Sequence, residues 1–367
     1  MSPASPPSTN HCILIIDHPR EMPESELDDF KKEWSGKGVK FLQYDLPKEA
    51  PFPSKSYVFD QLRKLDQEAG PIDGCVSFCT FISSYQPINA DFCETLPSLG
   101  LLAGTGAGFD RIDIDAFSKH SVYYCNTPKS FSKPTADSAS VLILAVLKNT
   151  IIGDRTIRAG KWQENMPKGL NPKGATLGIL GMGTIGGITC KQMQAFGMKV
   201  VYHNRKRLPE DREEGATFVP SLSEFLKQCD VVSVHVPLNA SSRHLLSAKE
   251  FAMFKTGARL VNTARGSVVD EQALVEALQS GKLSGAGLDV FENEPDVHPW
   301  LVESDNVLLT PHIAGDTLGT VAEAMREILQ SLSSYLSIEK GQPPLNAVNQ
   351  IEPRKSRLNI WLRFHGH

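Results

Sequence analysis

The stretch from Ala175 to Arg207 (ATLGILGMGTIGGITCKQMQAFGMKVVYHNRKR) constrains the fold of this chain more than any other part. Its apolar run, residues 176–180, is bounded by turn residues and is typical of a buried parallel strand. Residues 184–196 have the length and apolar spacing of a helix, and a second strand begins at Lys199. A strand, a glycine-rich turn, a helix and a strand predict a βαβ unit.

The turn of this unit has the spacing G-x-G-x-x-G. Gly181 permits a sharp turn, Gly183 lets the backbone approach a pyrophosphate, and Gly186 lets the helix pack closely on the strand. The exposed N–H groups at the start of the helix favour negative charge. Glycine-rich turns also occur for purely conformational reasons, but the place of this one between a strand and a helix predicts dinucleotide binding.

The residues after the second strand bear on which dinucleotide binds. NAD-dependent enzymes usually have Asp or Glu about 20 residues beyond the first glycine, where it holds the ribose 2′-hydroxyl. Here the chain reads HNRKR, with Asn204, Arg205 and Arg207 and no acid. A carboxylate would repel a 2′-phosphate, whereas the two arginines can pair with one in forked geometry. A solvated basic loop is the alternative; we favour NADP(H), with NAD(H) as the second candidate.

Length and composition bear on the number of domains, the kinds of partner and the cellular compartment. A chain of 367 residues exceeds one ordinary core, so two domains are expected. The net charge of −4 gives no basic surplus for nucleic acid or an anionic membrane, and no apolar run approaches the roughly 20 residues of a membrane span. The N-terminus lacks signal-peptide features, and the seven cysteines form no C-x-x-C pair. We therefore expect a cytoplasmic protein with reduced thiols and no metal site.

Short apolar runs, typical of strands, alternate with segments of helical spacing along most of the chain. In the first ~125 residues this predicts helices at 23–34, 56–68 (with Ser56 as N-cap) and 92–96, and strands at 12–16, 39–44, 74–78, 99–103 and 122–125. A helix at 134–147 crosses into a second sheet, whose further strands are expected at 230–236, 258–263, 286–290 and 306–309. Helices are expected at 154–160, 222–227, 271–279 and 318–336. The pattern predicts doubly wound parallel sheets in two α/β domains.

Two loops follow strands of the first domain. Cys79, Thr80 and Phe81 follow the third strand, and a glycine-rich loop at 104–110, which includes Gly108, follows the fourth. The glycines could offer N–H groups to a substrate carboxylate, and a tight turn that needs positive φ is an equal alternative. Phe78, Phe81 and Tyr85 could line a pocket or belong to the core.

Three ionisable residues each follow a different strand of the second domain. Arg265 follows LVNTA, Glu294 follows GLDVFEN, and His312 follows NVLLTP. Each alone could be an ordinary surface or loop residue, but ligands of open α/β sheets bind outside the carboxyl ends of the strands. Reduction of a 2-oxo acid needs a cation for the carboxylate and a proton donor for the carbonyl oxygen. Arg265 suits the first task and His312 the second, while Glu294 would favour the imidazolium and orient the ring.

These residues also carry a resemblance to a known family. The segments GMGTIG, HVPLN, NTARGSVVDEQAL, GAGLDVFENEP and NVLLTPHIAG, with GAGFDRID, CNTP and RAGKW upstream, resemble the D-isomer-specific 2-hydroxyacid dehydrogenases over about residues 70–335. The resemblance implies catalytic roles for Arg265, Glu294 and His312. It also implies cofactor contacts at Gly183, Thr184, Ile185, Pro237, Thr263, Ala264, Asp289 and Gly315.

The resemblance further implies an architecture. A flavodoxin-like substrate domain would comprise residues 1–130 and 318–350, and a Rossmann dinucleotide domain residues 131–317, with a tail at 351–367. The family is usually dimeric through the dinucleotide domain, and its two domains close by a hinge motion. The family's substrate loop falls near Phe78, Cys79 and Thr80.

The basic stretch at 203–207 resembles the NADPH-dependent glyoxylate/hydroxypyruvate reductase branch, and Glu294 argues against formate dehydrogenases, which have Gln there. We therefore expect reduction of glyoxylate, hydroxypyruvate or a bulkier 2-oxo acid to a D-2-hydroxy acid. The alternative is a dinucleotide-sensing protein with little turnover, similar to the corepressors that share this fold.

Overall fold

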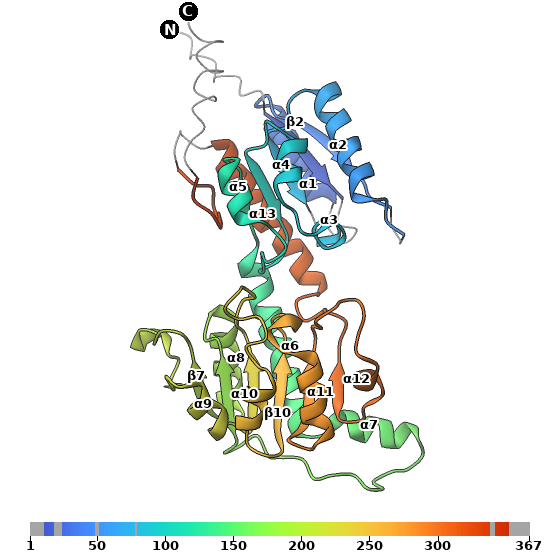
Figure 1. The fold of residues 1–367 in the computed structure, drawn as a ribbon. Helices are drawn as coiled ribbons and strands as arrows, with labels where there is room; N and C mark the ends of the chain where they lie inside the picture. The colour runs from blue at the N-terminus through green and yellow to red at the C-terminus, as the bar shows by residue number, and fades with distance from the viewer. Residues whose placement is uncertain (1–10, 18–23, 48–50, 78, 338–341, 352–367) are drawn as a thin grey trace, which may run out of the picture. The chain divides into compact units, whose positions relative to one another are not determined.

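The computed structural model describes residues 11–17, 24–47, 51–77, 79–337 and 342–351. The chain divides into two compact units (Figure 1). The first comprises residues 1–131 and 318–367, and the second comprises residues 132–317. Each unit is an α/β structure built on one parallel sheet.

The first unit contains a five-stranded sheet with the order β2-β1-β3-β4-β5. Its strands are β1 (Cys12–Ile16), β2 (Lys40–Tyr44), β3 (Gly74–Ser77), β4 (Leu101–Gly104) and β5 (Tyr123–Cys125). Its helices are α1 (Glu24–Ser35), α2 (Lys55–Ala69), α3 (Cys79–Tyr85), α4 (Ala90–Thr95), α5 (Ile114–Lys119) and α13 (Leu318–Ser337). All neighbouring strands pair in parallel. The strand order is the flavodoxin-like order.

Helices cover both faces of this sheet. Helices α2 to α5 bury side chains such as Leu62, Phe92 and Phe117 against one face. Helices α1 and α13 bury Leu27, Ile328 and other apolar residues against the opposite face. The strands are therefore buried on both sides, which explains why they read as continuous apolar runs.

The second unit contains a seven-stranded parallel sheet with the order β12-β11-β10-β9-β6-β7-β8. Its strands are β6 (Thr176–Leu180), β7 (Lys199–His203), β8 (Thr217–Phe218), β9 (Val231–Val234), β10 (Ala258–Asn262), β11 (Leu283–Leu288) and β12 (Val307–Leu309). Its helices are α6 (Pro128–Leu147), α7 (Thr150–Arg158), α8 (Thr184–Ala195), α9 (Leu222–Gln228), α10 (Ala248–Met253), α11 (Glu271–Gln279) and α12 (Pro299–Glu303). Short 3-10 turns span Glu210–Arg212 and Gly266–Val268.

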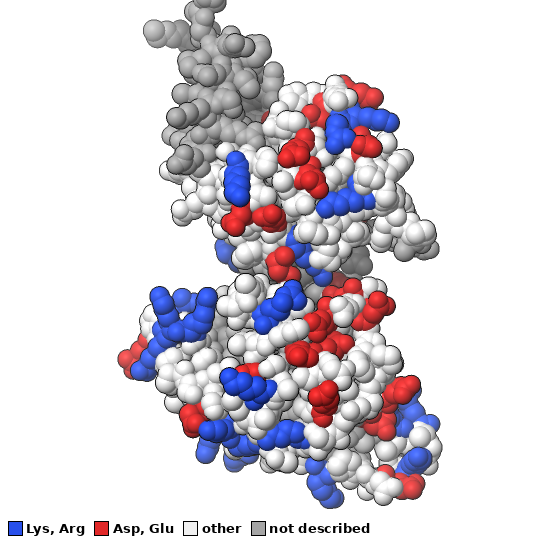
Figure 2. Space-filling model, viewed as in Figure 1, with Lys and Arg blue, Asp and Glu red and all other residues white. Residues whose placement is uncertain are grey.

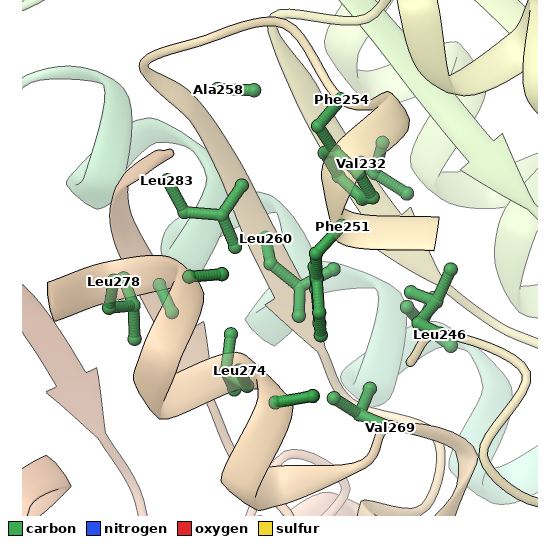
Figure 3. Packing of buried hydrophobic residues seen from close by; sticks show 14 of the residues in the cluster. Val232, Leu246, Phe251, Phe254, Ala258, Leu260, Val269, Leu274, Leu278 and Leu283 are labelled. Carbon is green, nitrogen blue, oxygen red and sulfur yellow. The ribbon is translucent and has the colours of Figure 1, made fainter. Parts of the chain in front are cut away.

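Helices also cover both faces of the second sheet. Helices α9, α10 and α11 pack on one face, where Figure 3 shows Phe251, Leu274 and Leu260 in one cluster. Helices α6 and α8 pack on the other face. The strand order reverses between β6 and β9, and this switch point is where doubly wound sheets bind ligands. The glycine-rich turn follows β6, so the fold places it at the switch point.

Three local predictions were wrong. The residues after β3 form α3, not a loop, because Phe81 and Tyr85 stand one helical turn apart and both pack into the core. Helix α2 begins one residue earlier than predicted, and its N-cap is Ser54, whose hydroxyl accepts from Tyr57 N. Helix α6 begins at Pro128, because proline is tolerated in a first helical turn, and Pro134 lies inside the helix.

No single helix in the described ranges is long and apolar enough to cross a membrane. Only α6 and α7 taken together, bent by 66° at their junction, reach that length and composition.

Candidate functional site

The glycine-rich turn between β6 and α8 has the geometry of a phosphate site. Gly181 has φ 103°, and a Cβ there would lie 2.8 Å from the backbone of His235 and Val236. A Cβ at Gly186 would overlap the carbonyl oxygen of Gly181. A Cβ at Gly183, in contrast, would meet no atom within 4 Å. Two glycines are therefore required by the fold, and the third leaves open space where a pyrophosphate could approach.

Helix α8 begins at this open position. Gly183 is its N-cap and has no side chain to satisfy the first N–H groups, which belong to the turn containing Thr184 and Ile185. Thr184 is exposed and Ile185 is half-buried. The N-terminus of a helix attracts anions, so the donor set fits a dinucleotide phosphate.

The basic stretch after β7 has two differently placed arginines. Figure 2 shows lysine and arginine side chains gathered beside β7, where Arg205, Lys206 and Arg207 are exposed. Arg207 donates from Nε and Nη2 to the two carboxylate oxygens of Glu213, at 2.8 and 3.0 Å. Arg205 has no hydrogen bond or ion pair with any residue that the structure describes. Only Arg205 therefore presents an uncommitted guanidinium.

Glu213 is the buried centre of a small polar cluster. Its Oε1 also accepts from the Tyr202 hydroxyl at 2.6 Å, and that hydroxyl accepts from Leu208 N at 3.1 Å. The hydrogen bonds from Arg207 and then Tyr202 lower the pKa of Glu213 to about 2. Asn204 is also engaged, because its Oδ1 accepts from Met182 N of the glycine-rich turn at 2.7 Å. These contacts fix the path of the chain from β7 to Glu213.

Arg265 lies in a tight turn directly after β10. Asn262 shapes this turn, since its Oδ1 accepts from Ala264 N at 3.0 Å and its Nδ2 donates to Arg265 O at 2.9 Å. Arg265 is half-buried, and its Nη1 donates to Ala264 O at 2.8 Å. A guanidinium has five N–H donors in a planar fork, a geometry that matches a carboxylate.

Glu294 and His312 form a hydrogen-bonded pair. His312 Nδ1 lies 2.8 Å from Glu294 Oε2, and the two side chains are 37% and 24% exposed. Because a carboxylate only accepts, the Nδ1 proton points at Glu294 and Nε2 is left for another partner. Glu294 Oε1 accepts from Phe291 N at 3.1 Å, which fixes the second oxygen of the same group. The structure thus joins two of the three predicted catalytic residues directly.

Asp289 anchors the segment that carries His312. Its Oδ1 accepts from Thr310 Oγ1 at 2.6 Å and from Ile313 N at 2.9 Å, and its Oδ2 accepts from Ala314 N at 2.9 Å. The side chain is buried. It therefore shapes the loop on both sides of His312, which has φ 56°. The sequence predicts Asp289 only as a cofactor contact, and its hydrogen bonds to this loop are evident only in the structure.

The other predicted cofactor residues lie at the same edge of the second sheet. Pro237 follows β9 and is exposed, Ala264 follows β10, and Gly315 follows β12 and is half-buried. Thr263 is buried, and its hydroxyl has no hydrogen-bond partner among the described residues. Such a hydroxyl is costly unless a ligand satisfies it, which supports a bound group at this edge.

The predicted substrate residues lie in the first unit. Gly108 is exposed in the loop after β4, which is held by Thr127 and Asn126: Gly106 N donates to Thr127 Oγ1 at 2.8 Å and Asn126 Nδ2 donates to Ala107 O at 2.7 Å. The backbone of Cys79 and Thr80 lies in α3, and their side chains, like Phe78, are outside the described part of the chain. Phe81 and Tyr85 are core residues, so they do not line a pocket.

The other residues that hold the predicted site in place were not predicted in that role from the sequence. Asn262 had a local signal, because Asn side chains readily accept from the backbone N–H two residues on and form an Asx turn. Glu213 and Asp289 had none, since their partners depend on the folded chain path. In the described ranges, no group of three or more His, Cys, Asp or Glu side chains could hold a metal ion.

Residues 140–314, which span α8, the strand ends and all three predicted catalytic residues, match the family model described as D-isomer specific 2-hydroxyacid dehydrogenase, NAD binding domain. The chain is 36% identical over 339 residues to a glyoxylate reductase of Thermococcus litoralis, an alignment that covers 90% of this chain and 95% of that protein. The chain belongs to the D-2-hydroxyacid dehydrogenase family.

Other members of the family extend the comparison. A 4-methyl-2-oxopentanoate reductase A of Aspergillus oryzae is 42% identical over 257 residues, covering 70% of this chain and 77% of that protein. The crystal structure of a glyoxylate reductase from Paecilomyes thermophila superposes with a TM-score of 0.83 at 34% identity, covering 93% of this chain and 98% of that one. As a member of this family, the protein is a nicotinamide-dinucleotide-dependent oxidoreductase of 2-oxo and 2-hydroxy acids.

Proposed function

We propose that this dehydrogenase is an NADPH-preferring reductase of glyoxylate, hydroxypyruvate or a bulkier 2-oxo acid, with a D-2-hydroxy acid as product. The observation that carries the proposal is the Glu294–His312 pair, whose members follow β11 and β12, while Arg265 follows the adjacent strand β10. The names of the relatives support both a small substrate and a branched one.

In the proposed reaction each of the three side chains has one task. Arg265 binds the substrate carboxylate in forked geometry and polarises the adjacent ketone. When bound, the dinucleotide supplies the hydride that adds to the carbonyl carbon. His312 donates the proton at Nε2 to the carbonyl oxygen, while Glu294 holds the ring through Nδ1. The alcohol forms with one hydride and one proton gained.

The cofactor preference rests on the basic stretch after β7. We assign the 2′-phosphate to Arg205, because Arg207 is already paired with Glu213. No carboxylate follows β7 at the position where an NAD-dependent enzyme would hold the ribose 2′-hydroxyl.

We further propose that the protein is a homodimer in the cytosol and that the dinucleotide unit forms the dimer interface. Within α6 and in the segment from α6 to β6, this unit exposes apolar side chains that a partner could cover: Val141, Ile157, Trp162 and Leu170. The described cysteines are buried free thiols, which suits a reducing compartment.

The first test compares wild type with His312→Ala, using NADPH or NADH with glyoxylate, hydroxypyruvate and 4-methyl-2-oxopentanoate. Loss of the proton donor should lower kcat by about 10²- to 10⁴-fold and leave the dissociation constant of NADPH little changed. His120→Ala, in the first unit, is the control. Near-normal turnover by His312→Ala would refute the assignment, and wild-type preference for NADH would refute the cofactor proposal alone.

A further inference from the structure

Glu292, two residues before Glu294, lies where three loops of the second unit meet. Its Oε1 accepts from His244 Nε2, a residue of the loop that follows β9. Its Oε2 accepts from Glu271 N at the start of α11, at 3.3 Å. The side chain is 22% exposed. One carboxylate therefore ties the segment after β11 to the segments after β9 and β10.

A reciprocal contact strengthens this junction. Glu292 N donates to Glu271 Oε2 at 3.1 Å, so the two glutamates each accept from the other's backbone. Glu271 Oε1 accepts from His298 N at 3.3 Å, which ties down the far end of the same loop. The loop after β9 is held on its other side, because His244 N donates to Ser267 O at 2.9 Å.

This junction leads directly to the residues of the proposed reaction. The Phe291–Glu292 peptide lies against Gly266, the neighbour of Arg265, so closely that a Cβ at Gly266 would overlap it. Phe291 N donates to Glu294 Oε1, and Glu294 Oε2 receives the Nδ1 proton of His312. Movement of the Phe291–Glu292 peptide would therefore displace Arg265, Glu294 and His312 together.

We propose that Glu292 is a positioning residue that holds Arg265 and the Glu294–His312 pair in register for hydride and proton transfer. This inference rests on the catalytic roles proposed above. Glu292 acts through Phe291 N and Gly266. Misplacement of reacting groups by about 1 Å can cost 10²-fold in rate, so loose anchoring should slow the chemical step.

The test is Glu292→Gln in the full-length enzyme, with Glu276→Gln on the exposed face of α11 as the matched control. An amide can accept with one oxygen only, so one of the two contacts is lost. NADPH oxidation in a single turnover with glyoxylate should show a rate constant lowered about 10- to 100-fold, with the amplitude per enzyme unchanged. A merely structural role would lower the amplitude and the melting temperature and leave the rate constant as in wild type, which would overturn the proposal.

Variants of His244 provide a second test, which does not require the Glu292→Gln variant to fold. His244→Gln keeps an N–H donor and should retain the wild-type single-turnover rate, whereas His244→Ala should be slower. Equal rates for wild type, His244→Ala and Glu292→Gln would refute the positioning role. If His312→Ala also retained turnover, the proposed catalytic roles would fail instead, so the two failures are distinguishable.

Discussion

Arg205 and Arg207 lie two positions apart in the sequence, yet the structure gives them different partners. Arg207 makes a forked pair with buried Glu213, and Arg205 extends into solvent. Both were expected to pair with a 2′-phosphate, and pairing with Glu213 makes Arg207 the poorer candidate. A guanidinium already held by a carboxylate would have to give up that contact to bind phosphate.

Arg205→Ala should therefore raise the KM for NADPH and leave the KM for NADH nearly unchanged. Arg207→Ala should raise both KM values by a similar factor, because it loosens the loop that both cofactors share. Initial rates with each cofactor at saturating glyoxylate measure this difference. A selective effect of Arg207→Ala on NADPH would show that the Glu213 pair opens when the cofactor binds.

The Glu213 cluster also predicts how stability depends on pH. Folding lowers the pKa of Glu213 from 4.5 to about 2, so the folded protein keeps this carboxylate ionised where the unfolded chain protonates it. Its contribution to stability is complete above the unfolded pKa and is lost as the pH falls toward the folded one. The loss in unfolding free energy caused by Glu213→Gln should thus shrink between about pH 5 and about pH 3, as measured by urea unfolding. A difference that does not vary with pH would contradict the prediction.

At the scale of elements, two glycines at the junction of β6 and α8 have different roles: Gly186 is required for packing, and Gly183 leaves space for the ligand. Gly186→Ala places a methyl group against the Gly181 carbonyl and should destabilise the protein by about 1–3 kcal/mol. Gly183→Ala meets no protein atom and should change stability by less than about 0.5 kcal/mol. Its methyl group would instead occupy the space beside α8, so NADPH binding should weaken strongly. Thermal unfolding and fluorescence titration with NADPH test the pair, and unimpaired binding by Gly183→Ala would rule out this phosphate site.

Most strands and long helices could be predicted from the sequence, because each is a continuous apolar run or an amphipathic repeat. The two-residue strand β8 and the beginning of α6 were not predicted. Helix α11 has the predicted bounds, and α13 differs by one residue. Several short helices were not predicted. Helices α10 and α12 have six and five residues, too few for a period to stand out, and they form because Phe251 and Leu301 pack into the core.

The sequence predicted that Arg265, Glu294 and His312 each follow a different strand and that Glu294 orients His312, but it did not predict the residues that hold them in place. Arg265, Glu294 and His312 follow strands that are recognisable in the sequence, and parallel strands bring such residues to one edge. The residues that hold these three in place come from other segments of the chain. His244 is hydrogen-bonded to Glu292, and Asp289 anchors the loop that carries His312. No periodicity encodes such pairs, since they depend on loop paths that only the folded chain defines.

At the scale of the whole molecule, the two units differ in how the chain builds them. The second unit is one continuous segment, residues 132–317, with both faces of its sheet covered by its own helices. The first unit is assembled from both ends of the chain, and α13 supplies Met325, Ile328 and Leu332 to one face of its sheet.

This difference has a consequence for synthesis on the ribosome. The N-terminal strands and α1 emerge first, but the cluster that contains Ile13, Val76 and Leu101 is not complete until α13 has been translated. The middle of the chain can complete its own core before then, so the segment made second should fold first. In the interval the nascent N-terminal sheet exposes the part of this apolar face that α13 later covers, which is the kind of surface that chaperones bind.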